Sequence, residues 1–202
     1  MNNIQNIDGL VCLGKQKKKK QIILTHTSRN IKDYVSAIKH RYNGKYDKIP
    51  NFLIGRDGVV YRLIPENGYT NYFPNLNVNR NSIIISLENL GWLEKIPLTE
   101  HYVNWNGDIY KEQVFEKKWR DYFFWQPYTT EQINSCVELC KELTTEFSID
   151  KKCVGHNTRI EGIERFDGIV SKSNFDSDYT DLSPAFNFEN FLKQLEDEQF
   201  IR

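Results

Sequence analysis

Two of the four histidines in this 202-residue sequence stand at the ends of apolar segments. His26 closes the segment 21–26, and His156 follows Val154 and Gly155. A side chain at the tip of a buried strand is well placed for chemistry. A catalytic zinc site takes three protein ligands from His, Asp, Glu or Cys and leaves a fourth position for water. Because a lone histidine at a strand end is more often structural, two of them do not by themselves predict a metal site.

Strand-like and helix-like segments alternate along the chain and would position these histidines. Asp57-Gly58 between two apolar segments is a strong β-hairpin signal, and a continuous apolar segment such as 82–87 is typical of a central strand. The expected elements are strand 21–26, helix 31–41, hairpin 51–63, strand 82–87, a helix from Thr129, a short strand ending at His156, a polar loop over 157–179 and a final helix from Asn187. The sequence therefore predicts a single α/β domain with a central mixed sheet flanked by helices.

Composition narrows the class of protein. Hydrophobic residues make up 39% of the chain, enough for one sizeable core, and 27 basic residues balance 27 acidic ones. This balance favours neither nucleic acid nor an anionic membrane as a partner. The basic segment 15–20 is interpreted as a solvated lead-in rather than a patch for anionic polymers. No apolar segment has the length of a membrane span or a secretion signal, so we expect a soluble, monomeric, cytoplasmic chain.

The four cysteines have no short-spacing disulfide pattern and are expected to be reduced. Cys136 and Cys140 lie four apart on a predicted helix and could bind metal, but their apolar neighbours favour small buried residues. An aromatic-rich segment at about 92–127, with Trp105, Trp119 and Trp125, has no clean period and is interpreted as an ordered insertion. Its rings either fill a local core, which we prefer, or present a carbohydrate-binding or assembly surface. The expected organisation is a lead-in at 1–20, a domain at 21–192 and a charged tail at 193–202.

The order of these segments resembles the zinc-dependent N-acetylmuramoyl-L-alanine amidases, a family that includes phage lysins and is related to the peptidoglycan recognition proteins. The similar segments are 22–28 ending in His26-Thr27-Ser28, NFLIGRDGVVYRL at 51–63, SIIISLENLG at 82–91 and Cys153-Val154-Gly155-His156. The resemblance implies a zinc hydrolase that cuts the amide bond between N-acetylmuramic acid and L-alanine in peptidoglycan, with zinc polarising the amide and activating water. A phage or prophage endolysin, reaching the wall from the host cytoplasm after membrane damage, is preferred to a recycling enzyme.

The resemblance also implies a third zinc ligand, an aspartate after the second histidine in a segment of the form K-x-D-P-G-P-x-F. Asp167 has nearly the family spacing, but Asp181-Leu182-Ser183-Pro184-Ala185-Phe186 matches the local pattern better. Because loops lengthen at small cost, we assign the ligand to Asp181, with 157–179 as an insertion. The predicted zinc ligands are thus His26, His156 and Asp181.

The proton-transfer groups depart from the family pattern. Pro50 stands where many relatives have a catalytic tyrosine, and Ser86 stands where others have a glutamate. Glu88, on the same strand face as Ser86, is the candidate general base, weighed evenly against a surface or structural carboxylate. Tyr179 takes the place of a family lysine and is a candidate hydrogen-bond donor to the oxyanion. These departures keep open a second function, a peptidoglycan-binding module that does not cut.

Overall fold

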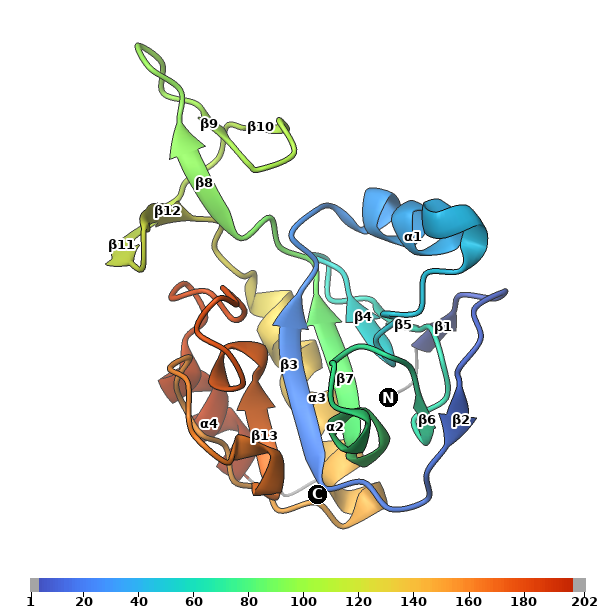
Figure 1. Ribbon diagram of the computed structural model, residues 1–202. Helices are drawn as coiled ribbons and strands as arrows, with labels where there is room; N and C mark the ends of the chain where they lie inside the picture. Colours follow the sequence, from blue (N-terminus) through green and yellow to red (C-terminus); the bar gives the residue numbers. More distant parts are fainter. Residues whose placement is uncertain (1–3, 198–202) are drawn as a thin grey trace.

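The computed structural model describes residues 4–197, and its centre is a six-stranded mixed sheet with the strand order β1-β5-β4-β7-β3-β13 (Figure 1). Its strands are β1 (Ile4–Asn6), β3 (Gln21–His26), β4 (Phe52–Ile54), β5 (Val60–Arg62), β7 (Ser82–Leu87) and β13 (Gly168–Ser171). β3 runs parallel to both β7 and β13, whereas β4 and β5 form the antiparallel hairpin predicted around Asp57-Gly58. The predicted α/β fold with a central mixed sheet is confirmed.

Helices cover both faces of this sheet. Ile22, Leu24 and Ile85 point to one face, where they share a core with residues of α3 and α4. Ile23 and Ile84 point to the other face, because successive strand residues alternate in direction. The helices are α1 (Ile31–His40), α2 (Leu76–Asn81), α3 (Thr130–Phe147) and α4 (Phe188–Glu196), with short 3-10 turns η1 (Arg41–Gly44), η2 (Ile163–Arg165) and η3 (Lys172–Asn174). Burial on two faces explains why β3 and β7 read as unbroken apolar segments.

Local signals in the sequence start the helices where they were expected. Thr129 and Gln132 form a reciprocal capping box at the beginning of α3. The Asn30 side chain accepts a hydrogen bond from the backbone N–H of Asp33 and caps α1. Both caps satisfy amides that have no partner within the helix.

The aromatic segment forms a second, five-stranded sheet with the order β10-β9-β8-β12-β11, so it is ordered, as predicted. Its strands are β8 (Trp92–Lys95), β9 (Tyr102–Val103), β10 (Ile109–Tyr110), β11 (Phe115–Trp119) and β12 (Tyr122–Trp125). It projects beyond the carboxyl ends of β3 and β7 in Figure 1. Trp125 is fully buried, whereas Phe123 is 52% and Trp105 45% exposed. The rings therefore fill a local core and also leave aromatic surface free.

The segment after α3 differs from the prediction. His156 does not end a strand; the backbone makes one isolated bridge, Cys153 to Ile169, before it. The segment 157–179, predicted as polar loop, contains β13 at the edge of the main sheet. β13 has only four residues and is flanked by polar residues, so its sequence is too short to show the hydrophobic pattern of a strand. Its buried state comes from pairing with β3, which lies far away in the sequence.

Residues 4–20 also join the fold. β1 pairs with β5 in the main sheet, and β2 (Gly14–Lys15) pairs with β6 (Gly68–Tyr69). Within the basic segment Lys15, Lys17, Lys18 and Lys20 are exposed, as expected of a solvated lead-in, but Lys19 is buried. Its Nζ donates to the carbonyls of Gly68, Arg80 and Ser82 at 3.0–3.1 Å. The solvated interpretation is wrong for Lys19, because these converging carbonyls replace water around its ammonium group.

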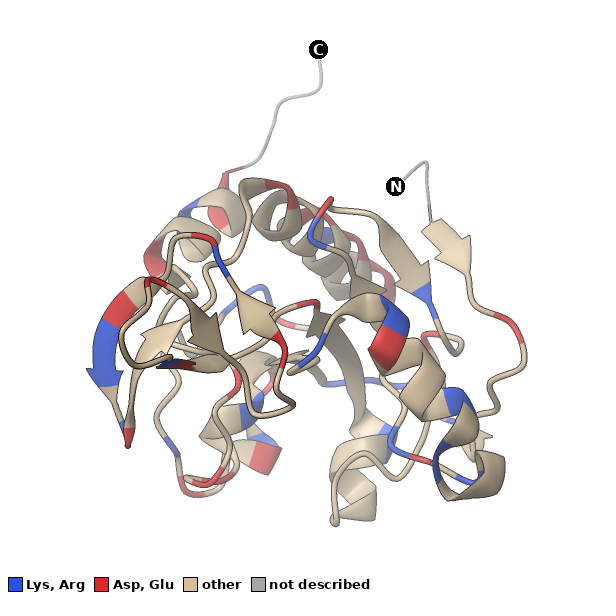
Figure 2. Ribbon diagram, turned by 90° about the horizontal axis from the view of Figure 1, so that it is seen from above, with Lys and Arg blue, Asp and Glu red and all other residues tan. Residues whose placement is uncertain are grey.

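The remaining predictions concern thiols and charge. All four cysteines are free, and Cys136 and Cys140 lie buried in the core beneath the sheet. Figure 2 shows the positions of basic and acidic residues interspersed along the ribbon, in keeping with the balanced composition. Among residues 4–197, no helix has the length and apolar character needed to cross a membrane.

Candidate active site

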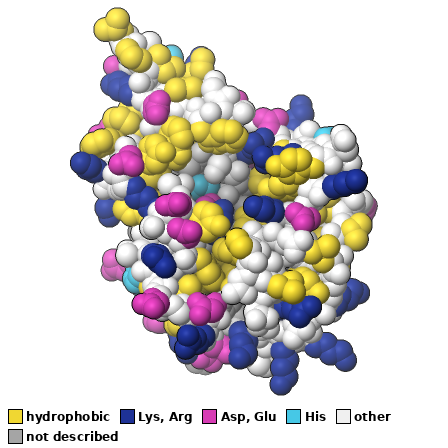
Figure 3. All heavy atoms as spheres, viewed as in Figure 1, with side chains coloured by type: hydrophobic (Ala, Val, Ile, Leu, Met, Phe, Trp, Pro, Cys, Tyr) yellow, Lys and Arg dark blue, Asp and Glu magenta, His cyan; other side chains and the backbone are white. Residues whose placement is uncertain are grey.

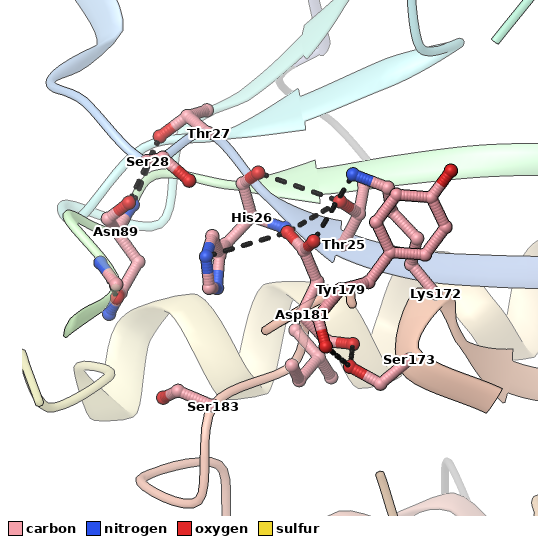
Figure 4. Close-up of polar contacts among 12 residues, drawn as sticks. Thr25, His26, Thr27, Ser28, Asn89, Lys172, Ser173, Tyr179, Asp181 and Ser183 are labelled. Carbon is pink, nitrogen blue, oxygen red and sulfur yellow. Dashed lines mark hydrogen bonds and ion pairs between the residues drawn. The ribbon is translucent and has the colours of Figure 1, made fainter. Parts of the chain in front are cut away.

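The carboxyl end of β3 brings His26 against Asp181, 155 residues later in the chain. Asp181 Oδ1 accepts hydrogen bonds from the His26 backbone N–H and from Thr25 Oγ1, each at 2.9 Å (Figure 4). The Asp181 carbonyl in turn accepts from the backbone N–H of Ser173 at 2.6 Å and from its hydroxyl. Strand β3 and the turn η3 therefore fix both the backbone and the carboxylate of Asp181.

The imidazole of His26 has one paired and one unpaired nitrogen. Nδ1 lies 3.1 Å from the Tyr128 hydroxyl, whereas Nε2 is buried and has no hydrogen-bond partner. Burial lowers the pKa of His26 despite the neighbouring Asp181, so the ring is neutral at pH 7. A neutral ring whose Nδ1–H donates to Tyr128 presents a lone pair at Nε2, the form in which histidine binds metals.

His26 Nε2 and Asp181 Oδ1 are 3.5 Å apart, too far for a good hydrogen bond. Two ligands of a tetrahedral zinc ion, with bond lengths of about 2.1 Å, lie roughly 3.4 Å from each other. Gly91 contributes to this environment, since a Cβ at that position would lie 3.0 Å from Nε2. His26 and Asp181 therefore fit two ligands of a zinc site.

A lysine already neutralises the carboxylate. Lys172 Nζ lies 3.2 Å from Asp181 Oδ2, and its ammonium lies 4.4 Å from the ring centroid of Tyr179. Burial alone would raise the pKa of Asp181, but His26, Lys172 and the two hydrogen bonds outweigh it and hold the pKa well below the usual range. Asp181 is therefore an ionised carboxylate in a site from which water is largely excluded.

The third predicted ligand, His156, is not brought to the other two. Its side chain is exposed, and its Nδ1 accepts a hydrogen bond from the Thr158 backbone N–H at 3.2 Å. The backbone of His156 does lie near the Asp181 segment, because Asn157 Nδ2 donates to the carbonyl of Leu182 at 2.9 Å. Among the described residues no group of three His, Cys, Asp or Glu side chains is arranged to hold a metal. As placed, the residues supply two zinc ligands and leave the third apart.

The alternative aspartate lies at the other end of the sheet. Asp167 precedes β13, whose first residue, Gly168, pairs with Gln21 at the beginning of β3. Gln21 and His26 are the first and last residues of β3 and lie roughly 17 Å apart along the strand. Asp167 Oδ1 instead accepts from the backbone N–H of Asp150. Of the two aspartates weighed from the sequence, Asp181 is the one beside His26.

Glu88, the candidate general base, has both carboxylate oxygens in use. Oε1 accepts from the Ile31 backbone N–H at 2.8 Å, and Oε2 accepts from the Arg56 backbone N–H at 3.0 Å. The first bond satisfies an amide at the beginning of α1, and the second holds the hairpin turn. These contacts are those of a structural carboxylate, the alternative interpretation of Glu88, and its role as general base stays a prediction.

Tyr179 lies beside Lys172, with its hydroxyl pointing away from the His26 ring in Figure 4. Lys172, supplied by η3, thus lies against the residue two positions before Asp181. Sequence reasoning missed Lys172 and Tyr128. Lys172 sits nine residues before Asp181, and its only sequence signal is a basic residue directly after an apolar segment. Tyr128 directly precedes the Thr129 cap, which fixes its place at the start of α3.

A cavity of about 360 Å³ opens beside the tip of β3, between α1 and the second sheet. Trp105 closes one side: its Nε1 donates to the Ser28 carbonyl at 2.7 Å, and the Arg29 guanidinium lies 4.7 Å from its ring centroid. The residues that line the cavity are Thr27, Ser28, Arg29, Tyr34, Ala37, Ile38, Arg41, Tyr46, Trp92 and Trp105. Figure 3 shows a hollow on this face, rimmed by apolar side chains and with a histidine inside. Two arginines and no acidic residue line the cavity, which suits an anionic ligand.

The fold is similar to solved structures of amidases and peptidoglycan recognition proteins. It matches N-acetylmuramoyl-L-alanine amidase LysC from Clostridium intestinale URNW with a TM-score of 0.59, at 16% identity over 98% of this chain and 100% of that one. It matches amidase AmiD from E. coli, complexed with the substrate anhydro-N-acetylmuramic acid-L-Ala-D-gamma-Glu-L-Lys, with a TM-score of 0.52, at 15% identity over 93% and 61%. The complex of peptidoglycan recognition proteins LCa and LCx bound to tracheal cytotoxin gives 0.55, at 14% identity and 92% of each chain.

No curated protein matches this sequence. Residues 15–167 do match the family described as N-acetylmuramoyl-L-alanine amidase, which is typically zinc-dependent. The matched segment includes β3 with His26, the hairpin, β7, the second sheet and α3. Since it covers well over half of the residues, the chain belongs to the N-acetylmuramoyl-L-alanine amidase family.

Proposed function

We propose that this protein hydrolyses the amide bond between N-acetylmuramic acid and L-alanine in bacterial peptidoglycan, with zinc as its cofactor. The observation that carries the proposal is the buried, unpartnered Nε2 of His26 facing the ionised Asp181 in a chain of the amidase family. An apolar interior leaves such a nitrogen without a partner only at a cost, which a bound cation would remove.

His26 and Asp181 are the proposed zinc ligands, with His156 as the third. Support for His156 comes from the fixed position of its backbone, whose carbonyl accepts a hydrogen bond from Asn174 Nδ2 at 2.9 Å. Asn157 ties the next residue to Leu182, beside Asp181. We propose that the His156 side chain turns toward His26 and Asp181 when the metal binds.

The cavity beside β3 is the proposed place for the substrate. Its arginines suit the carboxylates of a stem peptide, and Trp92 and Trp105 offer apolar faces for sugar or peptide groups. We propose that the protein is an endolysin of phage or prophage origin that acts on the wall as a monomer. The similarity to the structure named endolysine LysCS from Clostridium intestinale URNW supports the endolysin part of this proposal. The second sheet contributes both tryptophans, so it is proposed to shape substrate choice.

Two measurements on the purified protein test the proposal. The first is bound zinc by atomic emission, and the second is release of new L-alanine amino termini from purified sacculi. We expect about one zinc per chain and amine release that stops after chelation and returns with zinc. His26→Ala, His156→Ala and Asp181→Asn should each lose zinc and activity. Asp167→Asn is the matched control and should keep both.

A second candidate function, binding of muropeptides without cleavage, is favoured by one observation. Lys172 neutralises Asp181 while His156 faces solvent, an arrangement that needs no metal. Sacculus binding without zinc and without amine release would support the binder and refute the amidase. Zinc-dependent amine release would do the reverse.

A further inference from the structure

The carboxylate of Asp181 divides its hydrogen bonds unequally between its oxygens. Oδ1 accepts from Thr25 Oγ1 and from the His26 backbone N–H, and it lies 3.5 Å from His26 Nε2. Oδ2 is paired with Lys172 Nζ at 3.2 Å. A cation bound between His26 Nε2 and Asp181 Oδ1 would therefore share the carboxylate with the Lys172 ammonium.

Lys172 occupies a built position. Its side chain is 19% exposed and that of Asp181 is 7% exposed, so the pair has lost most of its water. The ammonium also lies 4.4 Å from the ring centroid of Tyr179 and 5.7 Å from that of Tyr72. The residue after Lys172, Ser173, donates to the Asp181 carbonyl, so the two charged residues are held together through their backbones.

We propose that the Lys172 ammonium and a divalent cation compete for Asp181, so that Lys172 stabilises the metal-free site and must leave Oδ2 when the metal binds. The reason is electrostatic. A buried carboxylate needs a cation beside it, and Lys172 supplies one where the metal ligands are incomplete. A lysine and a zinc ion at the same carboxylate repel strongly in surroundings with little water. This inference rests on the proposed function, because it assumes that His26 and Asp181 are the residues that take the metal.

The test is zinc titration into metal-free protein by calorimetry, for the native chain and three variants. Lys172→Met removes the charge and keeps the apolar stem, whereas Lys172→Arg keeps a cation. Lys152→Met is the matched control, because Lys152 also makes an ion pair, with Asp150 at 2.7 Å, and a ring contact, with Phe166 at 5.3 Å. Lys152 lies at the opposite end of β13, away from the site.

We expect Lys172→Met to bind zinc at least ten-fold more tightly than the native chain. Lys172→Arg should bind at or below the native affinity, and Lys152→Met should match it. In chelator, Lys172→Met should unfold at a lower temperature than the native chain, and zinc should raise its unfolding temperature by the larger amount. Equal or weaker zinc binding by Lys172→Met would overturn the competition while leaving the zinc amidase proposal standing.

A second measurement uses the native chain alone and does not depend on the variant folding. An amine-labelling reagent followed by peptide mass spectrometry reports the reactivity of each lysine. Zinc should raise the reactivity of Lys172 several-fold and leave Lys152 unchanged; zinc binding with no change at Lys172 would refute the exchange. Zinc binding by Lys172→Met but not by the native chain would support the competition and contradict zinc dependence of the native chain. Absence of binding in both would overturn both proposals.

Discussion

Replacing Glu88 by glutamine separates a structural role from a catalytic one. Glu88 is partly buried, and each of its oxygens accepts one backbone N–H, from Ile31 at the beginning of α1 and from Arg56 in the hairpin turn. Glutamine keeps one carbonyl oxygen but places an NH2 group against the other N–H. The variant therefore loses one hydrogen bond to a charged group and the negative charge near the amino end of α1.

The size of the effect follows from these contacts. A hydrogen bond to a charged group contributes about 1.5–3 kcal/mol, and a carboxylate at a helix amino terminus adds about 0.3–1 kcal/mol. We expect Glu88→Gln to lower the free energy of unfolding by about 2–4 kcal/mol. For a chain of this size, that corresponds to a fall of about 4–16 °C in the unfolding temperature.

The assay is urea and thermal unfolding followed by circular dichroism, with amine release from sacculi measured on the folded variant at low temperature. Glu131→Gln is the control, because Glu131 is an exposed acid in the first turn of α3. It should change stability by less than about 1 kcal/mol. Unchanged stability of Glu88→Gln, together with a loss of amide hydrolysis of about 100-fold or more, would refute the structural role and make Glu88 the general base.

Three further changes test other features of the structure. Burial lowers the pKa of Lys19 from 10.5 to about 8, so the folded chain binds fewer protons than the unfolded chain between these values and stability rises with pH there. Urea unfolding should give the native chain about 1–2 kcal/mol more stability at pH 9.5 than at pH 8, a gain that is absent in Lys19→Met. Gly91→Ala should cost about 1–3 kcal/mol in thermal unfolding and weaken zinc binding, because φ is +78° and the new Cβ would press on His26 Nε2; native zinc affinity would contradict this. Trp105→Ala should weaken muropeptide binding about ten-fold by calorimetry while leaving zinc content unchanged, and equal affinity would exclude the cavity as the substrate site.

Local patterns in the sequence were enough to place most of the elements around the site. The apolar segments of β3 and β7, the Asp57-Gly58 turn and the cap at Thr129 are each encoded within a few neighbouring residues. For that reason they could be recognised without any knowledge of distant contacts. The fold class and the family followed from the order of these elements.

Tertiary structure decided the chemistry that depends on residues far apart in the chain. β13 is a buried strand because it pairs with β3, and that pairing carries Lys172 to Asp181. The same reasoning applies to Glu88, whose backbone partners come from two separate elements. Contacts of this kind leave no periodic trace in the sequence, since they depend on non-local pairing and on the direction of single side chains.

The proposed zinc ligands depend partly on local sequence patterns and partly on tertiary contacts. The sequence by itself determined that His26 ends a buried strand and that Asp181, rather than Asp167, has the local pattern of a ligand. The structure placed these two side chains 3.5 Å apart, kept His156 at the surface and paired Asp181 with Lys172. Residue types and their order fix which ligands are available, whereas charge pairing in a buried site decides which of them meet.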